Sequence, residues 1–249
     1  MVVATSGVGT GWGGRRVCRS SRLASVCLRP VRARALPLLH LTVTGGLFLC
    51  PEALLKIVGT DGAEVERALL GGELGCPDCG GRLRPWGSAR RRVVRGPSGV
   101  ERRRPRRSRC VGCSVTHVLI STDTLLRRRD LAEVIGVALV AKATGLGYRR
   151  AAAGLVGVTA WTVRNWLRRF AVNAESVRVW FTVLAHDLDS MLAPIAPSGT
   201  VVGDAVEAVA VAARAASLRL APVAPWCFAS GASRGRLLSN TGCPWATAV

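Results

Sequence analysis

The sequence contains no glutamine and only two lysines, although lysine and arginine together number 35. Its positive charge is therefore carried almost entirely by arginine, whose planar guanidinium group binds phosphate through two parallel hydrogen bonds. Acidic residues number only 15, so the formal net charge is +20 at pH 7. Long uncharged apolar runs are also absent: the nearest candidate, residues 36–58, is interrupted by histidine, proline, glutamate and lysine. We therefore expect no membrane-spanning segment.

The charge is distributed unevenly along the chain. Formal charge is +7 for residues 1–50, −3 for 51–75, +10 for 76–113, +6 for 114–174 and zero for 175–249. An arginine bias from GC-rich coding would act along the whole chain, yet the last segment is neutral. A concentration of positive charge indicates a polyanionic partner, most often nucleic acid.

Residues 1–50 are rich in arginine, serine and glycine and contain no acidic residue. A leader of this composition is typical of an organelle transit peptide. It is equally typical of translated upstream sequence without a fold, which we favour. We expect disorder through about residue 50.

Residues 51–75 are expected to form a short lead-in helix, with Asp61 as its N-cap and Gly71-Gly72 as its end. Residues 76–122 are expected to form a β structure between and just after two cysteine pairs. Its strands would be broken at 96–99, which predicts a β-hairpin, and THVLIS would add a third strand.

The two C-x-x-C pairs supply Cys76, Cys79, Cys110 and Cys113. Each pair places two thiolates on one side of a tight turn, and two such turns complete the tetrahedral Cys₄ site that Zn²⁺ favours in structural roles. The spacing predicts a zinc ribbon. Rubredoxin-type iron, a redox pair and disulfides are weaker alternatives, and His117 is interpreted as a core residue, with ligation as the lesser alternative.

Residues 123–175 change to a helical period. Asp130 is expected to cap a helix whose apolar stripe ends near Gly145, with Glu133 completing a capping box. In YRRAAAGLVGVTAWTVRNWLRRF, a small residue (Ala153), a turn glycine (Gly157) and a capping threonine (Thr159) fit a helix-turn-helix. Residues 176–249 are expected to form a helical extension and an irregular tail.

The second helix of this pair would present an exposed face to DNA. Arginine can bind guanine and asparagine can bind adenine in the major groove, whereas other arginines position the protein on phosphates. The residues predicted to bind DNA are Thr159, Ala160, Trp161, Arg164, Asn165, Arg168, Arg149, Arg150, Arg169, Arg91, Arg103 and Arg106. Trp161 could instead pack against the preceding helix.

The chain combines a Cys₄ ribbon with a helix-turn-helix of the form G-Y-R-R-x-A followed by G-V-T-x-x-T-V-R-x-W-L-R-R-F. This combination resembles the DNA-end-binding region of bacterial insertion-sequence transposases. The chain is similar to an uncharacterised bacterial zinc-ribbon and helix-turn-helix family related to them. The resemblance covers roughly residues 55–240, including PWCFASGASRGRLL. It implies DNA binding through Arg164, Asn165 and their neighbours, with zinc on the four cysteines.

A catalytic transposase or integrase subunit would need carboxylates gathered by a mixed α/β domain. The acids after Phe170 are Glu175, Asp187, Asp189, Asp204 and Glu207, in a segment without alternating strands. We therefore expect a protein that is not an enzyme. RNA binding through the basic ribbon is a further alternative.

Taken together, the sequence predicts a mainly α protein with a small β zinc ribbon, a helix-turn-helix bundle, a helical tail and a disordered N-terminus. The expected cofactor is Zn²⁺ and the expected partner is double-stranded DNA, with a homodimer left open. The expected location is the cytoplasm, in association with the nucleoid.

Overall fold

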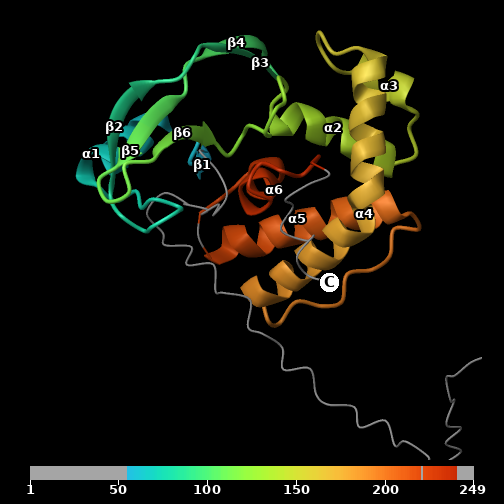
Figure 1. Cartoon of the computed structure of the whole chain (residues 1–249). Helices are drawn as coiled ribbons and strands as arrows, with labels where there is room; N and C mark the ends of the chain where they lie inside the picture. Colours follow the sequence, from blue (N-terminus) through green and yellow to red (C-terminus); the bar gives the residue numbers. More distant parts are fainter. Residues whose placement is uncertain (1–54, 220, 240–249) are drawn as a thin grey trace, which may run out of the picture. The chain divides into compact units, whose positions relative to one another are not determined.

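The computed structural model describes residues 55–219 and 221–239, so the predicted disorder of residues 1–50 lies outside the described part. The described residues form a mixed α/β structure with six helices and six strands (Figure 1). None of the helices in this part has the length and apolar character that a membrane crossing requires.

Four strands form one sheet in the order β1-β6-β5-β2. They are β1 (Leu55–Val58), β2 (Leu83–Ser88), β5 (Arg106–Cys110) and β6 (Thr116–Ser121). β1 runs parallel to β6, whereas the other two pairings are antiparallel. The expected THVLIS strand is thereby confirmed, but β1 was not predicted, because its partner is about sixty residues away along the chain.

The remaining strands, β3 (Arg92–Gly96) and β4 (Gly99–Arg103), form a separate two-stranded sheet. Their register places Gly96 opposite Gly99, with Pro97 and Ser98 in the turn. This confirms the hairpin predicted from the break at residues 96–99.

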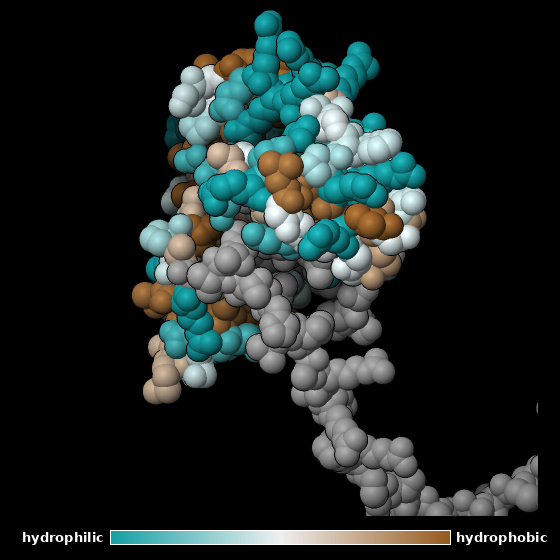
Figure 2. Space-filling model, turned by 90° about the vertical axis from the view of Figure 1, so that its left-hand side faces the viewer, coloured by the Kyte–Doolittle hydropathy of each residue, from teal (hydrophilic) through white to brown (hydrophobic). Residues whose placement is uncertain are grey.

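In the space-filling view, hydrophilic residues cover most of the visible described surface (Figure 2).

A small core lies between α1 (Gly62–Gly71) and the sheet. The side chain of Asp61 accepts a hydrogen bond from Ala63 N at 2.8 Å, which confirms it as the N-cap. Seven buried residues make up this core: Val58, Leu69, Leu74, Cys76, Leu83, Cys110 and Leu119. Because two of the seven are cysteines, apolar burial alone gives this part of the chain little stability.

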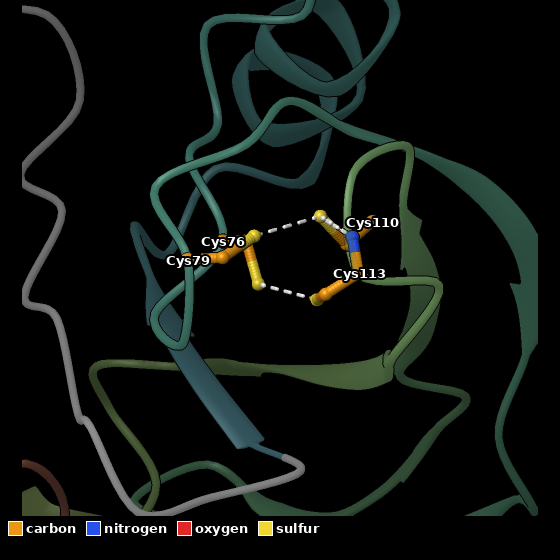
Figure 3. Close-up of side chains that lie close together, drawn as sticks. All are labelled: Cys76, Cys79, Cys110 and Cys113. Carbon is orange, nitrogen blue, oxygen red and sulfur yellow. Dashed lines mark hydrogen bonds between the residues drawn. The ribbon is translucent and has the colours of Figure 1, made fainter.

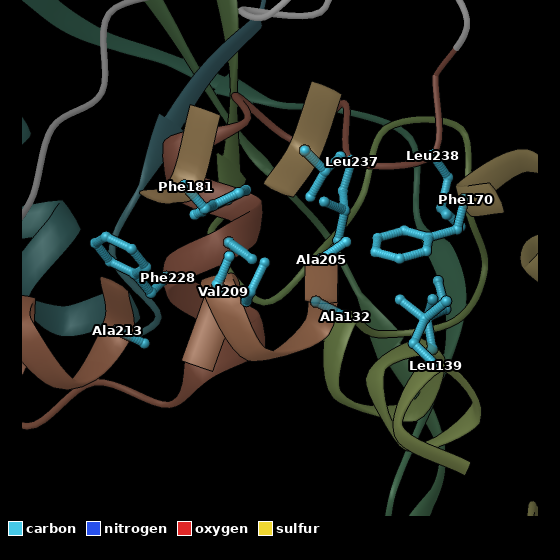
Figure 4. Packing of buried hydrophobic residues seen from close by; sticks show 14 of the residues in the cluster. Ala132, Leu139, Phe170, Phe181, Ala205, Val209, Ala213, Phe228, Leu237 and Leu238 are labelled. Carbon is cyan, nitrogen blue, oxygen red and sulfur yellow. The ribbon is translucent and has the colours of Figure 1, made fainter. Parts of the chain in front are cut away.

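A second and larger core is built by the remaining helices. They are α2 (Ala132–Ala143), α3 (Tyr148–Ala153), α4 (Ala160–Leu188), α5 (Val201–Arg219) and α6 (Pro225–Ala232). Phe170 and Phe181 of α4 are fully buried in it, and Phe181 meets Phe228 of α6 with ring centroids 6.3 Å apart (Figure 4). α4 continues without a break through residue 175, the boundary expected between two segments.

The structure differs from the local expectations at three places. Asp130 does not cap α2, since Leu131 is its N-cap and the Asp130 carboxylate binds Arg95 instead. Ala153 is exposed, whereas Ala151 and Ala152 are buried in the large core. The expected irregular tail contains a helix in its described part, α6, and it buries Leu237 and Leu238 in the large core.

The contact between α2 and α6 gives a first testable prediction. A Cβ atom added at Gly136 of α2 would lie 2.1 Å from Trp226 Nε1, so the indole fills the space that a side chain would need. We expect Gly136→Ala to destabilise the protein by about 1–3 kcal/mol, although alanine is the better helix former. Urea unfolding measures the change.

The matched control is the same substitution in a Trp226→Ala background. With the indole removed, Gly136→Ala should become stabilising by up to about 1 kcal/mol, the difference in helix propensity. Equal effects of Gly136→Ala in both backgrounds would show that the indole does not occupy this position.

Candidate functional site

Two loops bring four cysteines together. Cys76 and Cys79 lie between α1 and β2, and Cys110 and Cys113 lie at the end of β5 and in the turn after it (Figure 3). Their sulfur atoms all lie within 4.8 Å of one another, with 3.7 Å between Cys76 and Cys113 and 3.4 Å between Cys79 and Cys110. None of the four forms a disulfide. The predicted ligand set therefore assembles at one point.

These separations match a tetrahedral metal site. Four sulfurs around an ion at a Zn–S distance of about 2.3 Å lie about 3.8 Å apart, near the separations seen here. A disulfide would instead hold its two sulfurs at about 2.05 Å. The cluster could thus hold a metal ion, and its all-sulfur donor set suits a soft or borderline ion such as zinc or iron.

The loop of the first cysteine pair is closed by backbone hydrogen bonds. Gly80 N donates to Cys76 O at 2.9 Å, and Cys76 N donates to Gly81 O at 2.7 Å. A Cβ atom at Gly81 would lie 3.1 Å from Cys110 Sγ and 3.2 Å from Cys79 Sγ. A side chain at this position would crowd both sulfurs, so glycine suits it.

The surroundings of the thiols favour ionised ligands at one position in particular. The backbone N–H of Cys113, 3.4 Å from Cys110 Sγ, lowers the pKa of the Cys110 thiol to about 6. A thiol with a lowered pKa gives up its proton more readily to a bound cation. Cys227 of α6 is different, because burial raises its pKa to about 11, and it lies apart from the cluster.

Two buried polar residues lie beside the cluster. His117 Nε2 is 3.3 Å from Cys76 Sγ and 3.8 Å from the Asp78 carboxylate. The ammonium group of Lys56, fully buried, donates to Gly75 O, and burial lowers the pKa of this lysine to about 8 while Cys76 opposes the change. Groups of this kind hydrogen-bond and offset thiolate charge in metal sites. Lys56 was not singled out from the sequence. The signal was its residue type, because it is one of only two lysines in a chain whose other basic residues are arginines.

The second feature is the helix pair α3 and α4. The turn between them contains Gly157 at φ 68°, a left-handed conformation that glycine adopts without strain. Thr159 Oγ1 accepts from Thr162 N at 3.3 Å and so caps α4 as predicted. Val163 and Phe170 are fully buried, so one face of α4 points into the large core.

The opposite face of the first turns of α4 is exposed. Trp161 is 70% exposed, so it does not pack against α3. Arg164 and Arg168 are also exposed, and Asn165 is half-buried. Thr159, Arg149, Arg150 and Arg169 flank this face and are exposed, while Ala160 is half-buried.

Tyr148, the only tyrosine in the chain, organises two of these arginines. Its ring lies 5.9 Å from the guanidinium carbon of Arg164 and 5.8 Å from that of Arg149. Such cation–π contacts restrict where an exposed arginine points. The sequence did not predict this role, because the contact with Arg164 joins two helices.

Arg95 connects the β3–β4 hairpin to the α3–α4 turn. Its guanidinium donates to both carboxylate oxygens of Asp130, at 2.6 and 3.1 Å, and to Gly157 O at 2.6 Å. Backbone hydrogen bonds reinforce the connection, from Arg95 N to Arg129 O and from Leu131 N to Arg95 O. The hairpin and the helix pair are therefore held together at the turn.

The hairpin and sheet arginines differ from one another in their partners. Arg103 binds Asp123 at 2.6 Å and Glu101 at 2.8 Å, and Arg106 binds Glu66 at 2.6 Å. Arg91 is exposed and takes part in none of the ion pairs of the described residues. Of the three arginines, Arg91 is the one whose guanidinium is not already engaged by a carboxylate.

The five acids considered for catalysis do not gather at one point, although Glu175 and Asp204 both lie near Arg178. Glu175 pairs with Arg178, Glu207 pairs with Arg214, and Asp204 accepts from Ser198 N. Asp189 is the C-cap of α4, and Asp187 is exposed near that end. In residues 55–219 and 221–239, no group of three carboxylates has its oxygens within 4.8 Å.

Comparisons of the chain with protein-family models, with curated proteins and with solved structures found no match.

Proposed function

We propose that this protein binds double-stranded DNA selectively by sequence and depends on zinc for its fold. In this proposal the four cysteines hold Zn²⁺ as the structural ion of a zinc ribbon, and α3, its turn and α4 act as a helix-turn-helix. The protein would serve as a regulator or as a transposase-like DNA-binding module.

The observation that carries the proposal is the exposed face at the N-terminal half of α4. A large aromatic, Trp161, and two arginines, Arg164 and Arg168, stand in solvent on a helix whose other face is fully buried. A helix face that only contacts solvent is made of polar and charged residues. A tryptophan that is 70% exposed on such a face indicates an interaction surface. In a helix-turn-helix these are the positions that enter the major groove.

The chemistry of this face suits base edges. Arg164 could bind guanine O6 and N7 through two hydrogen bonds, and Asn165 could bind adenine N6 and N7. Ala160 and Trp161 offer apolar contact to a thymine methyl group. Flanking arginines would contact phosphates, which fix the position of the protein without specifying sequence.

The connection through Arg95 supports a shared binding surface for the hairpin and the helix pair. Because the Arg95 side chain ends on Gly157 O, the hairpin is fixed against the turn that precedes α4. A rigid connection of this kind spares the ordering cost that a flexible basic arm incurs on binding.

A comparison of two arginine variants tests the proposal. Arg164→Ala should weaken binding to a preferred duplex by about 1–3 kcal/mol and weaken binding to a scrambled duplex little, because a bidentate base contact is lost. The matched control is Arg150→Ala, an exposed arginine on α3. It should weaken both duplexes alike and reduce the salt slope by about one unit, because one phosphate contact is lost.

The measurement is duplex affinity at several salt concentrations, for each variant and for the unaltered protein. If the two variants lose affinity equally on both duplexes, α4 does not contact bases, and the protein is a nonspecific basic binder.

A further inference from the structure

A strongly basic cleft lies between the start of β3 and the loop that joins β6 to α2. Its volume is about 570 Å³, within the range of small-molecule sites. The cleft is lined by Arg90, Arg91, Arg92, Val93, Val94, Thr124, Arg127, Arg128 and Arg129. Six of these nine residues are arginines and none is acidic, so the cleft presents positive charge from both walls.

The charge of this cleft is not balanced within the described part of the chain. None of its six arginines belongs to an ion pair there. The two acids of the adjacent loop are already engaged, Asp123 by Arg103 and Asp130 by Arg95. The cleft therefore lacks a counter-charge of its own.

Arg128 shows the cost of this arrangement. Its Nη2 donates to Leu238 O at 3.3 Å, but its Nε is buried with no hydrogen-bond partner among the described residues. Burial and the neighbouring Arg169 lower the pKa of Arg128. A buried donor without a partner is unfavourable, so the protein holds this guanidinium in the cleft wall at a cost in stability.

The walls of the cleft are held in place before any ligand binds. Arg127 adopts φ 59°, a left-handed conformation that is uncommon outside glycine and is retained where the surroundings fix it. Leu126 N donates to Gly235 O at 2.8 Å on one side of it, and Arg128 N donates to Leu125 O on the other. The two walls are joined by the hydrogen bond from Arg95 N to Arg129 O at 2.6 Å.

We propose that this cleft binds a chain of consecutive phosphate groups. Guanidinium groups stay charged at all physiological pH values, and their planar fork matches two phosphate oxygens. A single phosphate would leave most of the six charges unbalanced, whereas linked phosphates could engage both walls at once. The chain of phosphates could belong to a nucleic-acid strand or to a free polyphosphate or nucleotide, and the inference concerns the chemistry that these share.

Tripolyphosphate is the probe that tests the proposal, with the full zinc-loaded chain at fixed ionic strength and calorimetry as the measurement. The unaltered protein should bind it saturably at one site. The double variant Arg91→Gln/Arg129→Gln removes two exposed cleft arginines and should weaken binding about tenfold or more. The control, Arg67→Gln/Arg219→Gln, removes two exposed arginines elsewhere and should stay within about twofold.

Absence of saturable binding would overturn the proposal, and so would an equal loss in the two double variants. Competition with a short duplex of random sequence then identifies the source of the phosphates. Displacement of tripolyphosphate by the duplex, with weaker duplex binding by the cleft variant, assigns the site to a nucleic-acid backbone. Duplex binding without displacement assigns it to a free polyphosphate. Failure of all duplexes to bind would contradict the proposed DNA function and leave the tripolyphosphate result intact.

Discussion

Removal of the metal ion proposed for the four cysteines is expected to unfold the four-stranded sheet and α1 while the helices from α2 to α6 stay folded. The hydrophobic cluster between α1 and the sheet has only seven buried residues, two of them cysteines that would hold the ion. A structural zinc ion contributes about 10–16 kcal/mol to folding in small sites. The helices, by contrast, share their own large core, which contains none of the four cysteines.

Cys79→Ser should have the same effect as a chelator, because it removes one of four ligands. The matched control is Cys227→Ser, which alters a half-buried cysteine outside the cluster and should leave the sheet folded. Segment-resolved hydrogen exchange measures the folding of the sheet after chelation and in the two variants, and the metal content of the purified protein is measured alongside. Slow exchange in the sheet after chelation would contradict a structural metal at the four cysteines. Bound iron would contradict the identification of that metal as zinc.

The second large effect is expected at the ion pair of Arg95 and Asp130. The Asp130 side chain is only 5% exposed, so Arg95→Ala would leave a carboxylate buried without its counter-charge. Breaking a buried pair in this way costs about 3–5 kcal/mol. Arg95→Lys should recover part of this loss, because lysine keeps the charge but cannot make the three hydrogen bonds of the guanidinium.

Arg178→Ala is the matched control for this prediction. It breaks an i,i+3 pair on the surface of α4 whose Glu175 partner is 61% exposed, and should change stability by less than about 1 kcal/mol. Urea midpoints of the three variants provide the measurement. An Arg95→Ala loss no larger than that of Arg178→Ala would show that the hairpin is not anchored to the helices through this pair.

The features that the sequence predicted correctly depend on local chemistry. The spacing of the cysteines, the Asp61 cap, the Gly157 turn and the Thr159 cap each follow from a few neighbouring residues. The exposed and buried faces of α4 follow from helical periodicity. In each of these cases the information needed lies within one or two turns of the chain.

The features that were missed depend on contacts between distant segments. β1 exists because it pairs with β6, and α6 forms in a Pro-, Gly- and Ser-containing stretch because the large core buries Phe228 and Ala229. Asp130 fits a helix cap by its local sequence, but Arg95, thirty-five positions earlier, binds its carboxylate instead. Tertiary packing outweighed local propensity at each of these sites.

Selection from a random pool of duplexes by the full zinc-loaded chain tests sequence-selective DNA binding most directly. After several rounds, the account predicts that one short motif is enriched. It also predicts that the Arg164→Ala protein no longer prefers one base pair within that motif, while the Arg150→Ala protein retains the whole motif. A pool that stays random in sequence, or a single-stranded RNA pool bound as tightly as the duplexes, would contradict the account.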